Sequence, residues 1–326
     1  MLRAALSTTA LAGALFAGAA SAQAADVVRE RVTFDSSGTQ IVGYHYAPAG
    51  SSPAAPLVVI AHGLGGLQSS RLQPFAERFA SAGYHALTFD YRNWGESSGT
   101  PRNLLDADRQ QADYRAAVAA APSLPGVDAR RIVLWGTSLS GGHVLSLGAK
   151  MPQLAGVIAQ APHVNGFATV SALPAGSLPR LTAVGLEDAA RAALGRSPKY
   201  VPLAGKPGDF AALTQAGAAE GYAFVQPTSP EPGNVMTARF VLQLPFYSPD
   251  ATAAKSTVPT FIGVADADNV TPPKPAVALA EKMRATLKHY AGGHFDVYPG
   301  ASQFEAVVGD ELSFLRSRVP LTQNAN

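Results

Sequence analysis

The sequence predicts an α/β protein with a mostly parallel central sheet that is covered by helices on both faces. Three observations lead to this prediction. Short apolar runs alternate with amphipathic stretches, the runs are apolar throughout, and one of them passes directly into a small-residue turn that carries a serine. Continuous apolar runs are typical of strands buried on both faces. Hydrophobic residues make up 47% of the chain, which is enough for a large core.

The apolar runs and their spacing place the elements of the core in order. We expect strands at residues 29–34, 40–46, 57–61, 85–89, 131–135, 156–160, 260–264 and 287–290, the first two as a hairpin. We expect helices around residues 72–79, at 105–121 and over the last apolar stretch from 304 to 315. Ser302 and Glu305 have the spacing of a capping box, which predicts that this last helix begins there.

The alternation stops between residues 165 and 256, which are rich in glycine, proline and alanine. A stretch of this length is rarely a bare loop in a compact domain. We therefore expect a helical lid over 165–256, inserted between the two parts of the core at 25–164 and 257–326. Its aromatic residues fit either the wall of an acyl pocket or a small core of the lid itself: Tyr222, Phe224, Phe240, Phe246 and Tyr247.

The N-terminus has the pattern of a secretory signal peptide over residues 1–24. A basic start is followed by an alanine- and leucine-rich run from 4 to 20, and small-x-small sites predict cleavage after Ala22 or Ala24. The run contains polar residues and is short for a membrane span. We expect a secreted or periplasmic protein, and an uncleaved anchor is the alternative.

Composition narrows the range of partners. The chain has no cysteine, so it has no disulfide, thiol nucleophile or thiolate metal site. A net charge of +2 with 15% charged residues and no basic run argues against nucleic acid and against stable membrane association. The histidines and acids lack the close spacings of zinc sites, and no phosphate-binding glycine loop is present, so we expect no metal and no cofactor. A small, mostly uncharged molecule is the expected partner.

The serine turn supplies the candidate nucleophile, Ser138. It lies in the run Gly136-Thr137-Ser138-Leu139-Ser140-Gly141-Gly142, between a strand and a helix. Such a turn exposes the serine at the tip of the strand and points the positive helix N-terminus toward the group it attacks. The spacing is Gly-x-Ser-x-Ser instead of the commoner Gly-x-Ser-x-Gly, and Ser140 is still small. The alternative is an ordinary serine in a glycine-rich turn.

A serine hydroxyl attacks a carbonyl only when a base takes its proton, and histidine suits this role near neutral pH. His294 lies in a glycine-flanked loop after the final strand and is the candidate base, whereas His289 lies within the strand pattern. A carboxylate must orient the imidazole. Asp266 and Asp268 both follow the strand at 260–264, so either one fits this role.

Several motifs together resemble the α/β-hydrolase superfamily over nearly all of the mature sequence. The run His62-Gly63-Leu64-Gly65 follows a central strand, and serine, acid and histidine follow in that order. Asp-x-x-x-Pro and Gly-Gly-His-Phe-Asp are similar to prolyl-peptidase-like and small-ester hydrolases. The resemblance implies an α/β-hydrolase fold with Asp268 as the acid. It also implies an oxyanion hole formed by the backbone amides of Leu64 and Leu139, with Gly65 or Gly66 as alternatives to Leu64.

The sequence thus predicts a secreted serine hydrolase that cleaves a carboxylic ester of a small or medium acyl group through an acyl-enzyme. An amide or short-peptide hydrolase with the same triad is the alternative, in which an acidic lid residue such as Glu187, Asp188 or Glu220 anchors an amine. An acid at the cavity mouth favours the peptidase, and an apolar mouth favours the esterase. A noncatalytic binding protein is a remote alternative, because all three triad positions hold competent residues.

Overall fold

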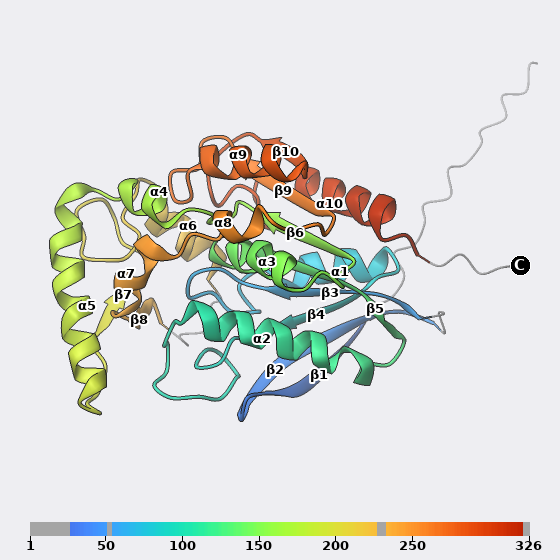
Figure 1. The fold of residues 1–326 in the computed structure, drawn as a ribbon, viewed down its shortest axis with the longest axis horizontal. Coiled ribbons are helices and arrows are strands. Elements are labelled where there is room, and N and C mark those ends of the chain that lie inside the picture. The colour runs from blue at the N-terminus through green and yellow to red at the C-terminus, as the bar shows by residue number, and fades with distance from the viewer. Residues whose placement is uncertain (1–26, 51–53, 227–232, 322–326) are drawn as a thin grey trace, which may run out of the picture.

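The computed structural model describes residues 27–50, 54–226 and 233–321 and shows a central sheet flanked by helices (Figure 1). The predicted signal peptide lies outside the described residues. Eight strands form the sheet in the order β1-β2-β4-β3-β5-β6-β9-β10. Their bounds are β1 Val27–Ser36, β2 Thr39–Pro48, β3 Ala55–Ala61, β4 His85–Phe89, β5 Val127–Thr137, β6 Gly156–Gln160, β9 Thr260–Ala265 and β10 Thr286–Tyr290.

The sheet is mostly parallel, as the sequence predicts. Strand β1 pairs antiparallel with β2, and β2 pairs antiparallel with β4, whereas the pairs from β4 through β10 are parallel. Every residue of β3, β4, β6 and β9 is buried. Parallel strands have their carboxyl ends at one edge of the sheet, so the loops that follow them converge there.

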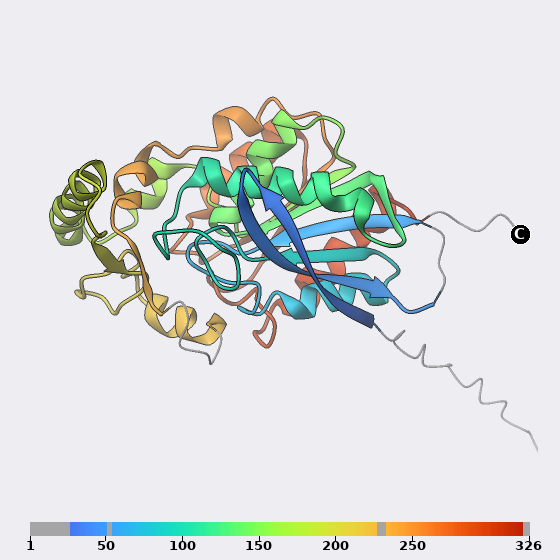
Figure 2. The ribbon, with the colours of Figure 1, turned by 90° about the horizontal axis from the view of Figure 1, so that it is seen from below.

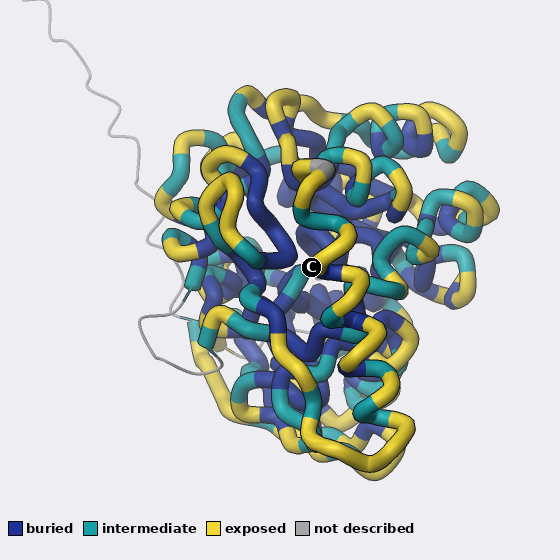
Figure 3. Tube along the Cα trace, turned by 90° about the vertical axis from the view of Figure 1, so that its left-hand side faces the viewer, coloured by how far each residue is buried: buried dark blue, intermediate teal, exposed yellow. Residues whose placement is uncertain are grey.

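Helices cover both faces of the sheet. Their bounds are α1 Gln73–Ser81, α2 Ala107–Ala120, α3 Leu139–Lys150, α9 Pro273–Met283 and α10 Phe304–Arg318. Alternating residues of β5 divide between the two apolar layers: Val133 and Trp135 pack with α1 and α10, whereas Leu134 packs with α2, α3 and α9. Figure 2 shows α2 and α1 on opposite sides of the strands. The buried segments run through the middle of the molecule in Figure 3.

Residues 165–256, called the insertion below, connect β6 to β9, which are neighbours in the sheet. Most of the insertion lies at one end of the molecule, at the left of Figure 1, whereas its last helix, α8 Asp250–Ala253, lies beside α3. Its elements are α4 Gly166–Ser171, η2 Ala175–Ser177, α5 Leu178–Ala193, β7 Tyr200–Pro202, α6 Ala218–Val225, β8 Val235–Thr237, α7 Phe240–Gln243, η3 Leu244–Phe246 and α8 Asp250–Ala253. Outside the insertion, the short helix η1 Ala121–Ser123 follows α2 in the core. Strands β7 and β8 form a small antiparallel sheet that the sequence does not predict.

The predicted capping box at the last helix is wrong. Helix α10 begins at Phe304, and its N-cap, Gln303, makes no side-chain cap hydrogen bond. Instead of turning back to the helix start, the Glu305 carboxylate accepts hydrogen bonds of 2.7 and 2.9 Å from Arg78 on α1. The contact between two helices thus replaces the local cap.

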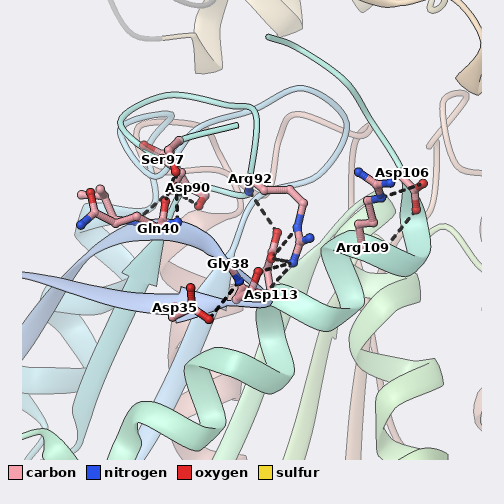
Figure 4. A network of polar contacts seen from close by, with 12 residues as sticks. Asp35, Gly38, Gln40, Asp90, Arg92, Ser97, Asp106, Arg109 and Asp113 are labelled. Carbon is pink, nitrogen blue, oxygen red and sulfur yellow. Dashed lines mark hydrogen bonds and ion pairs between the residues drawn. The ribbon is translucent and has the colours of Figure 1, made fainter. Parts of the chain in front are cut away.

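Polar side chains hold the loop after β4, shown in Figure 4. The Asp90 carboxylate accepts hydrogen bonds from the backbone N–H groups of Gln68 and Glu96 at 2.8 and 3.0 Å. Arg92 donates to the buried Asp113 carboxylate of α2 at 2.6 and 2.8 Å. The loop is therefore fixed to the neighbouring loop after β3 and to α2, which brings both loops to the edge where β5 ends.

Candidate active site

Ser138 lies at the turn between β5 and α3. Its backbone has φ 57° and ψ −125°, a conformation that residues other than glycine adopt at a cost of about 1–3 kcal/mol. The Ser138 N–H donates to the carbonyl of Gln160 at 2.9 Å, and its own carbonyl accepts from the His163 N–H at 2.9 Å. A Cβ at Gly136 would lie 2.4 Å from the Ser140 carbonyl oxygen, so the close approach of strand and helix requires glycine there. The turn that the sequence predicts is present.

Ser140 takes a structural position. It is fully buried, and its Oγ accepts a hydrogen bond from the Tyr91 hydroxyl at 3.1 Å and lies 2.6 Å from the Tyr114 hydroxyl. Tyr114 in turn donates to the carbonyl of Trp135 at 2.7 Å. The serine that replaces the usual glycine thus joins a buried chain of hydroxyls that links α3 to α2 and β5.

The structure brings Ser138, His294 and Asp268 together. The distance from His294 Nε2 to Ser138 Oγ is 3.0 Å, and that from His294 Nδ1 to Asp268 Oδ2 is 2.7 Å. The side chains come from the loops after β5, β9 and β10 and are all buried, with Ser138 8% exposed, Asp268 6% and His294 3%. Low solvent access strengthens the interactions between these groups. The arrangement suits proton transfer from the serine hydroxyl to the imidazole.

The Asp268 carboxylate has several further donors. Its Oδ1 accepts from the backbone N–H groups of Val270 and Thr271 at 2.8 and 2.7 Å, and its Oδ2 accepts from the Thr271 hydroxyl at 2.8 Å. Thr271 Oγ1 also lies 3.1 Å from His294 Nδ1 and 3.0 Å from the carbonyl of Ala161. Sequence reasoning missed Thr271, although its place three residues after the acid is a usable signal.

The second aspartate of the pair has a different partner. Asp266 Oδ1 lies 2.7 Å from His289 Nδ1, and the side chains of both residues are at least half exposed. The Asp266 N–H extends the pairing of β9 with β10 by donating to the carbonyl of Tyr290 at 2.9 Å. The two acids therefore each face their own histidine, and Asp268 is the one that faces His294.

Leu64 and Leu139, the residues of the predicted oxyanion hole, lie in the loop after β3 and at the start of α3. Leu139 is the first residue of α3, so its N–H has no acceptor within the helix. The loop after β3 contacts the serine, since a Cβ at Gly63 would lie 2.7 Å from Ser138 Cβ. In the described ranges neither the Leu64 N–H nor the Leu139 N–H donates a hydrogen bond, whereas the Gly66 N–H donates to Gly63 at 3.4 Å. The Tyr222 hydroxyl of the insertion donates to the Leu64 carbonyl at 3.2 Å.

The remaining buried histidines near the site are neutral at ordinary pH. The pKa of His62 is lowered to about 3, mainly by burial and to a smaller extent by the nearby His294. Burial also lowers the pKa of His143 to about 3 and that of His163 to about 4. Both histidines contact Tyr247 of the insertion. His143 Nδ1 lies at the Tyr247 hydroxyl, and His163 Nε2 lies 2.8 Å from the Tyr247 carbonyl oxygen. These residues pack the site and do not compete as bases.

A small chamber of about 20 Å³ surrounds the serine and histidine. Its lining residues come from the core loops after β3, β5 and β10 and from the insertion: His62, Leu64, Ser138, Leu213, Tyr222, Val225, His294, Phe295 and Tyr298. In the part of the chain that the structure describes, no three His, Asp or Glu side chains are placed to hold a metal ion. None of the described helices is both long and apolar enough to cross a membrane.

The three acidic residues that the sequence analysis names as possible amine anchors have other surroundings than the chamber. Asp188 is fully buried and pairs with Arg239 at 2.7 Å, Glu187 pairs with Lys199 at 3.5 Å, and Glu220 is exposed. None of these three acids lines the chamber.

The aromatic residues of the insertion divide among several roles. Tyr222 lines the chamber, and Phe240 lines a neighbouring apolar cavity. The Arg71 guanidinium lies over the Phe224 ring, with 3.9 Å between Arg71 Cζ and the centre of the ring. Tyr247 contacts the two histidines described above, whereas Phe246 is 86% exposed.

Comparison with known proteins agrees with this architecture. The family described as "Serine aminopeptidase, S33" matches residues 52–197. The quorum-quenching protein AidA of Acinetobacter baumannii (strain MDR-ZJ06) is 40% identical over 291 residues, which cover 89% of this chain and 95% of that protein. Two solved structures are similar in fold. The α/β hydrolase GrgF from Penicillium sp. sh18 has a TM-score of 0.75 at 23% identity and covers 89% of this chain and 99% of its own. DcsB in complex with its substrate analogue has a TM-score of 0.77 at 24% identity and covers 90% and 99%.

The sheet order, the serine turn and these matches define a hydrolase fold. The chain belongs to the α/β-hydrolase superfamily. Within that superfamily it is similar over most of its length to the quorum-quenching protein of Acinetobacter baumannii.

Proposed function

We propose that this protein is a serine hydrolase that cleaves a carboxylic ester through an acyl-enzyme. The observation that carries the proposal is the unbroken line of hydrogen-bond contacts from Asp268 through His294 to Ser138, with distances of 2.7 and 3.0 Å. Nucleophile, base and orienting acid are recognised by this geometry and not by their positions in a sequence.

The first half of the reaction forms the acyl-enzyme. His294 Nε2 takes the proton of the Ser138 hydroxyl as Oγ bonds to the ester carbonyl carbon. The negative charge that develops on the carbonyl oxygen is stabilised by the N–H groups of Leu64 and Leu139, and one such donor typically contributes about 10²–10³ in kcat. His294 then gives its proton to the alcohol oxygen as the carbon–oxygen bond breaks, so the alcohol leaves and Ser138 carries the acyl group.

Water completes the cycle by the same route. His294 takes a proton from water as the oxygen attacks the acyl carbon, and it returns that proton to Ser138 Oγ as the acid leaves. The buried Asp268 carboxylate holds Nδ1–H of His294 and stabilises the imidazolium that forms twice in each cycle.

The surroundings of the serine favour an ester over a peptide. A peptidase that captures an amine needs an acid near the chamber, yet Glu187 and Asp188 pair with basic residues and Glu220 faces solvent. The cavity beside the chamber is lined mainly by apolar side chains of the insertion. An apolar ester therefore fits these walls better than a charged peptide end.

Export is part of the proposal. The sequence of residues 1–24 supports cleavage after Ala22 or Ala24 and release into the periplasm or beyond. Expression of the full chain in a Gram-negative host, followed by mass determination of the protein in the periplasmic fraction, tests this. A protein of full-length mass that stays in the membrane pellet would indicate an uncleaved anchor.

A fluorophosphonate probe tests the chemistry of the site. We expect one adduct on the purified protein, located on the peptide that contains Ser138, because the probe needs an activated serine. Ser138→Ala should abolish labelling, and Ser123→Ala serves as the matched control, since Ser123 lies on η1 and does not line the chamber. Labelling that survives Ser138→Ala, or no labelling of the wild type, contradicts the proposal.

A substrate panel separates ester from amide hydrolysis. We expect p-nitrophenyl acetate and butyrate to be hydrolysed, and dipeptide and aminoacyl p-nitroanilides to be poor substrates. A preference for the anilides would identify a peptidase with the same triad.

The name of the Acinetobacter relative suggests a biological role to test. Purified wild-type protein and Ser138→Ala can each be added to a bacterial culture that carries a quorum-sensing reporter. Loss of the signal with the wild type alone would give this chain a quorum-quenching role as well.

A further inference from the structure

An apolar cavity of about 170 Å³ lies within the insertion and meets the core at Leu64. Its walls come from α4, α5, β8, α7 and η3 of the insertion, from the segment between β7 and α6, and from the loop after β3. Thr182 is the one polar residue among the described residues that line it. The side chains most deeply placed in these walls are Leu181, Met236 and Phe240, with exposures of 4%, 1% and 0%.

Two leucines connect this cavity to the serine. Leu64 and Leu213 line the apolar cavity and also line the chamber that contains Ser138. The chamber, at about 20 Å³, is no larger than a single water-sized group, which occupies about 30 Å³. A substrate whose carbonyl reaches Ser138 must therefore extend beyond the chamber, and the apolar cavity adjoins it across these two side chains.

The position of His294 decides which part of the substrate enters the cavity. The leaving alcohol must lie near His294, because His294 Nε2 protonates it. His294, Phe295 and Tyr298 all line the chamber, but none of them lines the apolar cavity. The cavity instead lies on the side of Leu64, whose N–H faces the carbonyl oxygen in the proposed reaction. The acyl side of the substrate therefore points toward it.

We propose that the apolar cavity is an acyl-chain site and that it sets a preference for medium-chain acyl esters. This inference rests on the proposed ester hydrolysis and adds the substrate class. At about 30 Å³ for each water-sized group, a cavity of 170 Å³ takes roughly five or six methylene or methyl groups. With the carbonyl carbon and the carbon beside it, this corresponds to an acyl group of about seven or eight carbons.

A series of p-nitrophenyl esters from acetate to myristate tests the chain length. Burial of one methylene contributes about 0.8 kcal/mol, which is about fourfold in kcat/KM. We expect kcat/KM to rise by about this factor for each methylene up to octanoate and then to fall. A flat profile, with acetate hydrolysed as well as octanoate, overturns the acyl site and leaves the ester hydrolase standing. No hydrolysis of any ester would overturn both.

Substitutions at Val170 test the location. Val170 lies on α4, is only partly buried and lines the cavity but not the chamber, so changes there leave the triad in place. Val170→Phe should lower kcat/KM for octanoate at least ten times more than it lowers kcat/KM for acetate, and Val170→Ala should move the optimum to longer chains. Val277→Phe on α9, also partly buried but outside the cavity, is the matched control.

Reversed esters distinguish acyl from alcohol binding. Methyl octanoate places the chain on the acyl side, and octyl acetate places the same chain on the alcohol side. We expect hydrolysis of methyl octanoate to be the faster by at least tenfold and to be the one that Val170→Phe impairs. If Val170→Phe impairs octyl acetate instead, or lowers all esters equally, the acyl assignment is wrong. Should Val170→Phe fail to fold, as judged by circular dichroism, the shift with Val170→Ala decides the question.

Discussion

Glu311 is a carboxylic acid in the apolar core, and its replacement by glutamine should change how stability depends on pH. It lies on α10 and is fully buried. Its Oε1 accepts a hydrogen bond from Trp135 Nε1 at 3.0 Å, whereas Oε2 has no partner among the described residues. Burial raises the pKa of Glu311 to about 8, with a smaller contribution from the nearby Asp310, although the Trp135 donor opposes the rise. The folded protein therefore holds this group in its neutral form.

The sign of the effect follows from the two pKa values. The carboxyl of the unfolded chain loses its proton near the ordinary value of 4.5, whereas the folded chain keeps its proton up to about pH 8. Stability that Glu311 contributes below pH 4.5 is therefore lost as the pH rises to about 8. Because each pKa unit corresponds to about 1.4 kcal/mol, the loss over this interval is roughly 5 kcal/mol.

Glu311→Gln keeps an oxygen for Trp135 Nε1–H and removes the titration. We expect the variant to match the wild type near pH 4.5 and to be more stable by several kcal/mol at pH 8.5. Urea unfolding followed by circular dichroism at pH 4.5, 6, 7.5 and 8.5 measures the difference. In thermal unfolding, at about 2 °C for each kcal/mol in a protein of this size, Tm should rise by roughly 10 °C at the highest pH.

The matched control is Glu305→Gln on the same helix, which makes the same chemical change at an exposed side chain. The ion pair of Glu305 with Arg78 is solvent-exposed, so its loss should cost less than about 1 kcal/mol at every pH. The reasoning is refuted if the stability curves of Glu311→Gln and the wild type run parallel from pH 4.5 to 8.5.

Three further substitutions probe the site and the loop beside it. Thr271→Val should lower kcat/KM about tenfold and move the acid limb of its pH profile to higher pH, because the Asp268 carboxylate loses a donor at 2.8 Å. Thr271→Ser should restore both properties, and an acid limb that does not move would make Thr271 a packing residue. Asp113→Asn leaves the buried Arg92 without its countercharge and should cost about 3–5 kcal/mol in urea unfolding, while a loss under 1 kcal/mol would contradict this. Tyr222→Phe frees the carbonyl of Leu64 and should lower kcat several-fold at unchanged Tm; equal loss of Tm and activity would point to general destabilisation.

The core of the fold was predictable because its signals are local. Strands β3, β4, β6 and β9 are buried along their whole length, so each appears in the sequence as a continuous apolar run. The order of serine, acid and histidine along the chain is equally visible. Parallel strands end at one edge, so three residues that follow β5, β9 and β10 meet there even though they are far apart in sequence.

The insertion was not predictable in the same detail. Strands β7 and β8 have three residues each, which is too short for a periodic pattern. The capping box failed for a related reason, because a contact between Glu305 and Arg78 across two helices outweighed a local bond. The apolar cavity is formed by side chains from several separate segments. None of these features has a signature in neighbouring residues, since each depends on contacts between distant parts of the chain.

Ser140 shows how a departure from a motif acquires a reason in the structure. The usual glycine two residues after the nucleophile keeps strand and helix close, and a serine there adds a hydroxyl to a crowded, fully buried position. A buried hydroxyl without partners would cost about 1–3 kcal/mol. Here the hydroxyls of Tyr91 and Tyr114 both contact it. Tyr91 belongs to the loop held by Asp90 and Arg92, so this loop and the nucleophile turn are joined through Ser140. The loop after β4 therefore supports the turn on which the proposed chemistry depends.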